Sequence, residues 1–422
     1  MKNAPVPATF AEIFAAVKDA APVVAALDDA RRAEILCATA EAVSARAEAV
    51  LAANAADCAR LSPSDPKFDR LLLTRERLAS VAADVRRVAA LPSPLGRVLD
   101  ERVRPNGLKI RKIAVPFGVV GVIFEARPNV TADVFSLCFK SGNACVLKGA
   151  HDAAETNAEL ASVIRGVLEK FGVPAAACTL LPPDRAAAGA LLNAVGIVDV
   201  VIPRGSRSLI DFARASASVP VIETGAGVCH AFIDDSADLR KAEAIVFNAK
   251  TRRVSVCNAL DCLLVHEKIA SSLPQICARL AEKNVKIFAD EKAFAALDAG
   301  NYPKNLLAHA VPEDFGTEFL DYKLCAKIVG SLDEAVAHIA RFGSRHSECI
   351  VAENAATAAR FMRDVDAACV YANASTAFTD GGEFGFGAEI GISTQKLHAR
   401  GPMGLEALTT YKYFIFGDGQ TR

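Results

Sequence analysis

An excess of charge of either sign is almost absent from this sequence. Its 422 residues carry 48 lysines and arginines against 49 aspartates and glutamates, which leaves a net charge of −1. Generic binding to nucleic acid or to an anionic membrane surface is therefore not expected. Hydrophobic residues make up 52% of the chain and charged residues 23%, as is typical of a globular protein. At roughly 100–200 residues per domain, the length predicts two to four structural units.

Long hydrophobic runs are also missing. The longest, residues 113–124, is interrupted by Pro116 and by two glycines, and it falls short of the ~20 apolar residues that a membrane-spanning helix needs. The N-terminus has no apolar segment followed by a small-residue cleavage site, so no export signal is expected. The twelve cysteines form no CxxC pair, as is typical of buried free thiols in a reducing compartment. We therefore expect a cytoplasmic protein without a membrane segment.

Helices are expected in the first hundred residues. An Ala-rich, charged run covers residues 28–60, and Leu and Val recur at spacings of three and four over residues 68–91. Residues 97–103 and 108–115 then flank a Pro-Asn-Gly turn and predict a β-hairpin. The β-prone segment 409–416 near the C-terminus is expected to add an interface strand.

Short apolar strands alternate with helical stretches through the middle of the chain. The first series is expected at residues 119–124, 144–148, 178–181, 198–202 and 230–233, and the second at residues 262–266, 285–289, 325–329, 349–352 and 369–372. This alternation indicates parallel sheets with crossover helices. Two α/β units in succession are the simplest interpretation.

The standard phosphate-binding motifs, GxGxxG and GxxxxGK[ST], do not occur. A lysine instead ends a predicted strand at Lys148, and a strand-to-helix turn contains Gly205 and Ser206, whose backbone N–H groups would face an anion at a helix start. Taken alone, each feature is better explained as a surface lysine or an ordinary turn.

Cys257 is the thiol with the most reactive surroundings in the sequence. It lies in a polar loop with Arg252 and Arg253, whereas most other cysteines lie in apolar runs or helical patterns. Nearby cations raise the thiolate fraction, so Cys257 is the best candidate nucleophile, although a structural thiol is an open alternative. No histidine stands at an obvious dyad spacing from it, and without HExxH or paired Cys/His spacing no metal site is expected.

The segment 380–391 has too many glycines for a packed helix or strand, which indicates a tight loop or the wall of a ligand site. Lys396, His398 and Arg400 follow it and gather positive charge. An anionic substrate explains this cluster, and so does a solvated basic turn.

Several long blocks now form a recognisable pattern. They are residues 115–121, 125–131, 140–143, 203–205, 256–260, 378–385 and 391–404. In this order they resemble the family of γ-glutamyl phosphate reductases, also called glutamate-5-semialdehyde dehydrogenases, of the aldehyde dehydrogenase superfamily. The resemblance covers nearly the whole chain.

The resemblance implies an aldehyde-dehydrogenase-like α/β fold with two doubly wound domains and a small β arm for oligomerisation. The implied divisions are a nucleotide-binding domain with N-terminal helices (1–96 and 116–253), a catalytic domain (254–375), the β arm (97–115 and 405–418) and a Gly-rich segment that returns to the active-site cleft (376–404). A homo-oligomer is expected.

The resemblance also assigns roles to residues. Cys257 is the implied nucleophile, Asn129 the side-chain oxyanion donor, Lys148 the contact to the adenosine ribose or its 2′-phosphate, Gly205 and Ser206 the turn facing the pyrophosphate, and Glu318 the partner of the nicotinamide ribose. One loop departs from the family: residues 223–227 read Glu-Thr-Gly-Ala-Gly where His-Gly-Asp-Gly is expected. Glu223 corresponds to the superfamily's base, which we expect to be a bystander or a cofactor contact.

The implied reaction is the NADPH-dependent reduction of L-glutamyl 5-phosphate to L-glutamate 5-semialdehyde and phosphate through a Cys257 thioester, the second step of proline synthesis from glutamate. The residues expected to bind the substrate, chosen by charge and block membership, are Arg127, Lys396 and Arg400 for the anions and the hydroxyls of Ser375 and Thr376. A glutamate 5-kinase is the expected partner, because the acyl phosphate is labile. Two alternatives remain at this point: an ordinary NAD(P)-dependent aldehyde dehydrogenase that uses water, and a catalytically inactive scaffold.

Overall fold

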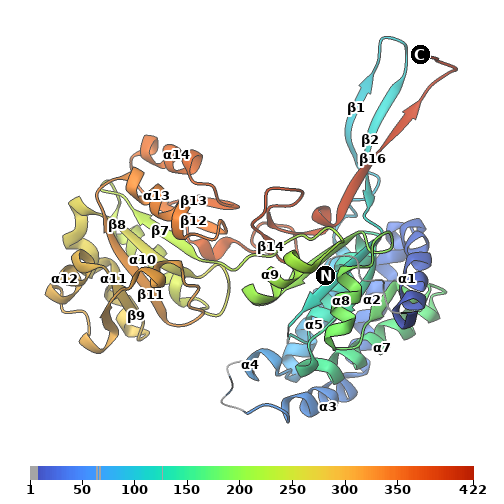
Figure 1. Cartoon of the computed structure of the whole chain (residues 1–422), viewed down its shortest axis with the longest axis horizontal. Coiled ribbons are helices and arrows are strands. Elements are labelled where there is room, and N and C mark those ends of the chain that lie inside the picture. The colour runs from blue at the N-terminus through green and yellow to red at the C-terminus, as the bar shows by residue number, and fades with distance from the viewer. Residues whose placement is uncertain (1–7, 63–64, 66–67, 126) are drawn as a thin grey trace. The chain divides into compact units, whose positions relative to one another are not determined.

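The computed structural model describes residues 8–62, 65, 68–125 and 127–422 (Figure 1). Residues 1–7, 63–64 and 66–67 of the predicted helical region, and Ala126 of the block 125–131, lie outside the described residues. The chain forms two compact units. The first comprises Met1–Thr224, Gly385–Gly391 and Met403–Arg422, and the second comprises Gly225–Phe384 and Ile392–Pro402. Each unit is described by itself.

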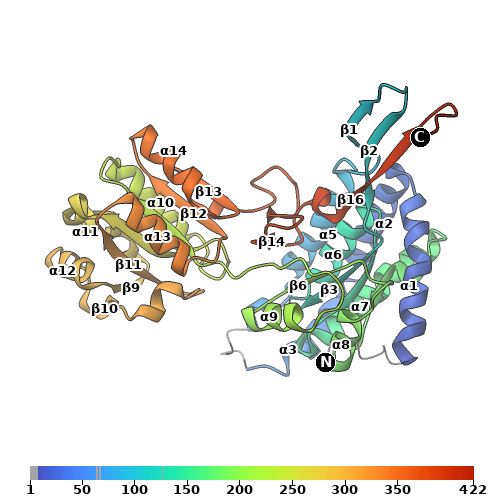
Figure 2. The same ribbon diagram turned by 45° about the horizontal axis from the view of Figure 1, so that its top comes forward.

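The first unit contains a parallel sheet of four strands in the order β5-β4-β3-β6 (Figure 2). Its strands are β3 (Val119–Phe124), β4 (Ala144–Lys148), β5 (Cys178–Leu180) and β6 (Val200–Arg204). Every residue of β3 is buried, which explains why these strands are continuous apolar runs rather than alternating patterns. The helices of this unit are α1 (Ala8–Ala26), α2 (Asp29–Ala45), α3 (Ala47–Cys58), α4 (Phe68–Leu71), α5 (Arg75–Ala90), α6 (Val130–Lys140), α7 (Ala154–Lys170), α8 (Arg185–Leu192) and α9 (Arg207–Ser216).

The two helical runs predicted from the sequence are each divided. Residues 28–60 break at Arg46, whose φ of −95° and ψ of 13° leave the helical region, and its guanidinium pairs with Glu159 at 2.6 Å. Residues 68–91 break before α5, because the Oγ1 of Thr74 accepts the N–H of Arg77 at 3.2 Å and caps a new helix there.

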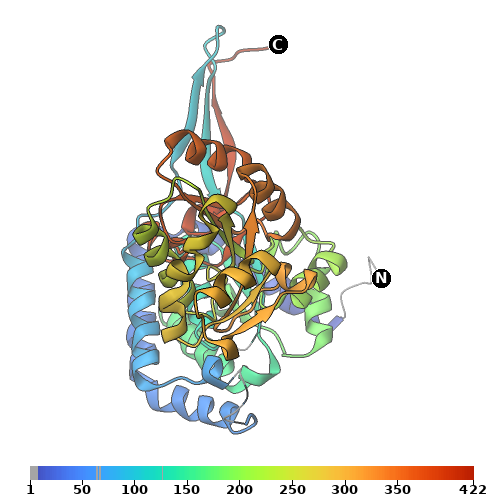
Figure 3. The ribbon, with the colours of Figure 1, turned by 90° about the vertical axis from the view of Figure 1, so that its left-hand side faces the viewer.

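The predicted hairpin is present and gains a third strand. β1 (Val98–Val103), β2 (Lys109–Pro116) and β16 (Thr409–Phe416) form an antiparallel sheet with β2 in the middle. This arm extends away from the other elements of the first unit (Figure 3). Val103 is 69% exposed and Ile415 is 61% exposed. The arm therefore presents apolar side chains outside the core of this unit.

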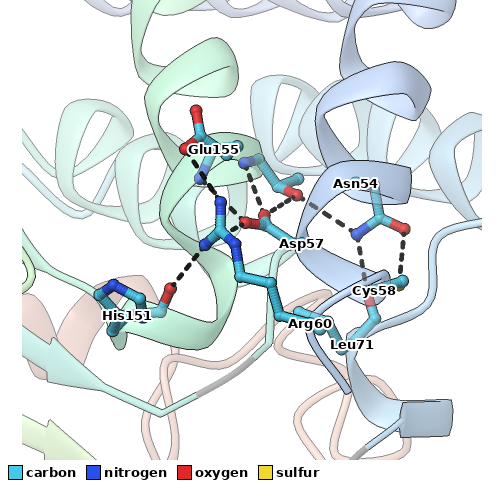
Figure 4. A network of polar contacts seen from close by, with 8 residues as sticks. Asn54, Asp57, Cys58, Arg60, Leu71, His151 and Glu155 are labelled. Atoms are coloured by element: carbon cyan, nitrogen blue, oxygen red, sulfur yellow. Dashed lines mark hydrogen bonds and ion pairs between the residues drawn. The ribbon is translucent and has the colours of Figure 1, made fainter. Parts of the chain in front are cut away.

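Buried polar groups fix the helical layer of the first unit (Figure 4). The fully buried carboxylate of Asp57 in α3 accepts the N–H groups of Glu155 at 3.2 Å and Thr156 at 2.8 Å, at the start of α7. The guanidinium of Arg60 pairs with the same carboxylate at 3.3 Å. A negative charge at a helix N-terminus is stabilising, so Asp57 ties α3 to α7.

The second unit is built on a parallel sheet of seven strands in the order β10-β9-β11-β8-β7-β12-β13. The strands are β7 (Cys229–Ile233), β8 (Leu260–His266), β9 (Lys286–Ala289), β10 (Leu307–His309), β11 (Lys323–Val329), β12 (Ser347–Val351) and β13 (Cys369–Ala372). The helices are α10 (Leu239–Thr251), α11 (Leu273–Glu282), α12 (Glu291–Ala299), α13 (Leu332–Phe342) and α14 (Ala355–Asp364). Leu263 and Val265 of β8 belong to one core cluster and Leu264 to another, so successive side chains enter opposite faces.

One strand lies in a different unit from the one expected. We expected residues 230–233 in the first series, but β7 pairs with β8 and β12 in the sheet of the second unit. The division between the units accordingly falls after Thr224, not after residue 253. The cause is pairing across long sequence separations, which the pattern within an apolar run does not encode.

The Gly-rich segment 376–404 is shared by both units. Gly385–Gly391 belongs to the first unit, whereas Ile392–Pro402 belongs to the second and contains the short paired strands β14 (Ile392–Ser393) and β15 (Gly401–Pro402). Among the residues that the structure describes, no helix combines the length and the apolar character needed to cross a membrane.

Candidate active site

Cys257 lies in the loop that joins α10 to β8. Its side chain is intermediate in exposure, whereas among the described thiols Cys37 is exposed and the other ten are buried. A thiol must reach a ligand and also be positioned by its surroundings to serve as a nucleophile. Cys257 is the thiol whose exposure meets both conditions.

The segment that leads into β7 contacts the main chain of Cys257. A Cβ atom added to Gly227 would lie 1.5 Å from the carbonyl oxygen of Cys257, so only glycine allows the two backbones to approach this closely. The thiol of Cys229 donates to the same carbonyl at 3.2 Å. The N–H of Gly227 in turn donates to Oε1 of Glu318 at 2.9 Å. Cys257 and Glu318, both predicted site residues, are thus linked through Gly227.

The residues that make these contacts lie at the same edge of the sheet. Gly227, Cys257 and Glu318 precede β7, β8 and β11, which are adjacent parallel strands. Their loops therefore meet at the amino-terminal edge of the sheet. Ligands of open α/β sheets usually bind at the carboxyl ends of the strands, and in the second unit the nucleophile lies at the opposite edge.

Thr376 also meets the Cys257 loop, and both Thr376 and its neighbour Ser375 are buried. The Oγ1 of Thr376 donates to the carbonyl of Asn258 at 2.8 Å, and the Oγ of Ser375 accepts the N–H of Ala377 at 3.2 Å. The side-chain amide of Asn258 donates to the carbonyl of Thr379 at 2.9 Å. Both hydroxyls were predicted to bind substrate. That of Thr376 holds the Cys257 loop, whereas that of Ser375 caps the short turn at Thr376–Phe378.

A buried ion pair connects the two ends of the Cys257 loop. Nζ of Lys250, in the last turn of α10, lies 3.3 Å from Oδ1 of Asp261 in β8. Burial raises the pKa of Asp261 to about 7, and the charge of Lys250 opposes that rise. Burial likewise lowers the pKa of Lys250. The same Oδ1 accepts the N–H of Phe319 at 3.3 Å, beside Glu318, so one carboxylate ties three segments of the site.

The predicted anion-binding cations share one carboxylate. Lys396 and Arg400 each lie 2.8 Å from a different oxygen of Asp366. Hydrogen bonds from Lys396 and then Arg400 lower the pKa of Asp366 to about 2. The carboxylate therefore stays ionised and offsets part of their positive charge.

In the first unit, Lys148 lies at the carboxyl end of β4 beside a cavity of about 370 Å³. Burial lowers the pKa of the half-buried Lys148, and Asp184 opposes this shift. The cavity is lined mostly by apolar side chains and main chain, namely Gly149, Ala150, Ala154, Glu155, Asn157, Ala158, Leu180, Leu181, Pro182 and Pro183. A Cβ atom at Gly149 would lie 2.3 Å from Nδ2 of Asn157, so glycine keeps this wall open. An apolar cavity beside a cation fits the adenosine end of a dinucleotide.

The turn at Gly205 and Ser206 precedes α9, as expected for a site that faces a pyrophosphate. A carboxylate of the chain itself occupies its donors. Oε2 of Glu125 accepts the N–H of Ser206 at 2.9 Å, and Oε1 accepts the hydroxyl at 2.5 Å. The turn therefore binds an anion in this structure, and that anion is Glu125.

Asn129 and Arg127 follow β3. Nδ2 of Asn129 donates to Oδ2 of Asp133 at 2.7 Å, which leaves the second N–H of this amide for another acceptor. Burial raises the pKa of Asp133, and the charge of Arg204 opposes that rise. The carbonyl of Arg127 accepts the N–H of Val130 at 3.1 Å. Both predicted residues belong to the first unit.

The atypical loop 223–227 is divided between the units. Glu223 lies 3.6 Å from Arg214, and the Oγ1 of Thr224 donates to the carbonyl of Pro203 at 2.5 Å. Sequence reasoning missed Lys250, Asp261, Glu125 and Asp366 as parts of these sites. Asp261 carried a signal, because it is a charged residue inside an otherwise apolar strand.

The chain matches a known protein family over most of its length. The family model described as "Aldehyde dehydrogenase family" matches residues 6–299. The gamma-glutamyl phosphate reductase of Parabacteroides distasonis is 61% identical over 404 residues, covering 96% of this chain and 97% of that protein. The enzyme of the same name from Bacteroides thetaiotaomicron is 59% identical over 409 residues, covering 97% of this chain and 98% of that protein.

Solved structures extend the similarity to the fold. The crystal structure of gamma-glutamyl phosphate reductase from Thermotoga maritima has a TM-score of 0.93 at 40% identity, with 98% of this chain and 99% of that chain covered. An acetylating aldehyde dehydrogenase from Geobacillus thermoglucosidasius has a TM-score of 0.70 at 19% identity, over 98% of this chain and 97% of that chain, and shows the same fold. The predicted fold class is confirmed.

Proposed function

Because this chain belongs to the aldehyde dehydrogenase family, and within it to the gamma-glutamyl phosphate reductases, we propose that it reduces L-glutamyl 5-phosphate to L-glutamate 5-semialdehyde and phosphate with NADPH. The reaction would be the second step of proline synthesis from glutamate. The observation that carries the chemical part of this proposal is the half-buried thiol of Cys257. The main chain of its loop is contacted by Gly227, Cys229 and Thr376.

The proposed first step is acyl transfer to Cys257. The thiolate attacks the carbonyl carbon of the acyl phosphate, a C–S bond forms, and the C–O bond to phosphate breaks. The proposed donors to the tetrahedral oxyanion are the backbone N–H of Cys257 and the side-chain amide of Asn129. One such donor is worth about 10²–10³-fold in rate. The products of this step are a Cys257 thioester and inorganic phosphate.

NADPH, when bound, supplies the hydride that the reduction of the thioester requires. For its adenosine end we propose Lys148 and the cavity beside it, for its pyrophosphate Gly205 and Ser206, and for its nicotinamide ribose Glu318. Cys257 leaves as a thiol when the semialdehyde departs. This direction needs no base to activate water, which suits Glu223 in its contact with Arg214.

For the substrate we propose Arg127, Lys396 and Arg400 as partners of its carboxylate and phosphate groups. Lys396 and Arg400 bring two cations to one carboxylate, Asp366, so a positive charge is left over for an anion. Thr376 contributes by holding the loop of Cys257, because its buried hydroxyl donates to the carbonyl of Asn258. The hydroxyl of Ser375 accepts the N–H of Ala377 in the adjoining turn.

Three further proposals concern the setting of the enzyme. The β arm, with apolar side chains such as Val103 and Ile415 exposed, would pair with a second copy of the chain in a homo-oligomer. A glutamate 5-kinase is the proposed partner that delivers the labile acyl phosphate. Ten buried free thiols fit a reducing compartment such as the cytoplasm.

The test runs the reaction backwards. Semialdehyde and NADP⁺ are supplied with and without phosphate, and NADPH formation is followed for the native chain, for Cys257→Ala and for Cys37→Ala, which removes an exposed thiol. We expect phosphate-dependent turnover that Cys257→Ala abolishes and Cys37→Ala leaves intact. Turnover that does not depend on phosphate would identify an ordinary aldehyde dehydrogenase, and no turnover by the native chain would identify an inactive scaffold.

A further inference from the structure

Three side chains of the second unit converge away from the Cys257 loop. His230 comes from β7, Cys262 from β8 and His338 from α13. His230 and Cys262 are direct register partners in adjacent parallel strands, so both side chains leave the sheet on the same face. One ligand atom from each residue lies within 4.8 Å of the other two. All three residues are buried.

The distance between Cys262 and His338 fits a small tetrahedral cation. Zinc binds thiolate sulfur at ~2.3 Å and imidazole nitrogen at ~2.0–2.1 Å, so a tetrahedral site places sulfur and nitrogen about 3.6 Å apart. The Sγ of Cys262 and the Nε2 of His338 are 3.6 Å apart. One thiolate and two imidazoles are ligands that zinc prefers, and such a set leaves a fourth position for water or a small anion.

His230 is oriented as a ligand. Its Nδ1 is bonded to Oε2 of Glu348 at 2.9 Å, and its backbone N–H donates to the same oxygen at 2.8 Å. The other ring nitrogen, Nε2, is fully buried and has no hydrogen-bond partner among the described residues. A carboxylate on one nitrogen of a histidine, with the other nitrogen free, is the usual arrangement behind a zinc-bound imidazole.

The charges also balance. Glu348 is fully buried, and the ion-pair partner that the described residues give it is His230. A Zn²⁺ ion would be neutralised by the thiolate of Cys262 together with the carboxylate of Glu348, so no net charge would be buried. The rings of Phe315 and Phe342 flank His338 with centroids 5.3 Å and 4.7 Å away, which excludes bulk water from the ligands.

We propose that His230, Cys262 and His338 bind one zinc ion per chain, oriented by Glu348 and separate from Cys257. The ion would fix β7 against β8 and α13. Because Cys229, the first residue of β7, donates to the carbonyl of Cys257, the proposed ligand His230 directly follows a residue that holds the nucleophile. The ligands stand at positions 230, 262 and 338, which explains why no spacing motif revealed them in the sequence.

The test uses the full chain, stripped with a chelator and titrated with Zn²⁺ against a chromophoric competitor. We expect one equivalent per chain by elemental analysis, and with Co²⁺ a thiolate-to-metal charge-transfer band in the near ultraviolet. Cys262→Ser should remove the band and the bound metal. Glu348→Gln, which keeps the size of the side chain, should weaken binding about 10–100-fold.

Two controls make the outcome decisive. Cys349→Ser changes an equally buried thiol on the opposite face of the same sheet and should keep full zinc binding. Cys257→Ser should keep it as well, since that thiol lies outside the cluster. The proposal is overturned if the native chain binds no zinc and gives no thiolate band with Co²⁺, or if Cys257→Ser abolishes binding while Cys262→Ser does not.

Discussion

In the first unit the residues proposed to hold the cofactor follow strands: Lys148 ends β4, and Ser206 follows β6. In the second unit the residues around the nucleophile precede strands: Cys257 precedes β8, and Gly227 precedes β7. Both units are parallel sheets covered by helices, and they use opposite edges. At a carboxyl edge helices begin and offer N–H groups to anions. At the amino edge of the second unit, side chains of neighbouring segments bond to main-chain groups of the loops. These bonds fix the position of the Cys257 loop without a bound ligand.

The largest effect is expected from a substitution at the amino-terminal edge of the sheet in the second unit. Lys250 and Asp261 are both buried, so removing one charge leaves the other uncompensated, which typically costs about 3–5 kcal/mol. Asp261→Asn should lower the free energy of unfolding of the second unit by that amount, measured by hydrogen exchange of the β8 amides. The double variant Lys250→Met/Asp261→Leu should recover most of the loss. An unchanged exchange rate in Asp261→Asn would show that the pair does not hold the loop.

A smaller change at the same edge should affect catalysis more than stability. In Gly227→Ala the new methyl group would lie 1.5 Å from the Cys257 carbonyl oxygen, so the loop must move. A displacement of about 1 Å can cost ~10²-fold in rate, and we expect a loss of kcat of that size. Gly166→Ala is the matched control, because a Cβ there meets nothing within 4 Å. Equal kcat in both variants would contradict the positioning role of Gly227.

Part of this architecture could be predicted from the sequence. Apolar runs located most strands of both sheets, and the polar context singled out Cys257. The contact of Gly227 with Cys257, the sharing of Asp366 by Lys396 and Arg400, and the membership of β7 in the second sheet depend on partners far apart in the chain. The local sequence pattern carries no information on such pairing, so these features could be identified only in the folded structure.

At the carboxyl edge of the first unit, removing the charge of Glu125 should strengthen the binding of NADPH. Glu125 places a carboxylate on the N–H of Ser206, where the proposed pyrophosphate would have to compete with it. An anion at a helix start is worth about 0.3–1 kcal/mol, so Glu125→Gln should lower the KM for NADPH about two- to fivefold with little change in kcat. Glu169→Gln, on the exposed side of α7, is the control. A raised KM in Glu125→Gln would instead make Glu125 part of the cofactor site.

The smallest expected effect is on the pH dependence of the protein's stability. The pKa of Asp366 is lowered to about 2, below the ~3.9 of an unfolded aspartate, so its contribution to stability is present above pH ~4 and is lost as the pH falls towards 2. Asp366 has 44% of its side chain exposed, and exposed pairs are worth little. Asp366→Asn should therefore destabilise the protein by about 0.5 kcal/mol at pH 6, with the difference shrinking as the pH falls from 5 to 3. A difference that grows on acidification would refute the assignment.

The central claim is that the sulfur of Cys257 carries the glutamyl group during the reaction. Semialdehyde and NADP⁺ supplied without phosphate should give a burst of one NADPH per chain, and intact-protein mass spectrometry should then show one added glutamyl group on the peptide that contains Cys257. Phosphate should release the group and restore turnover. Turnover without any acylated Cys257 peptide, or a glutamyl group on another residue, would contradict the account.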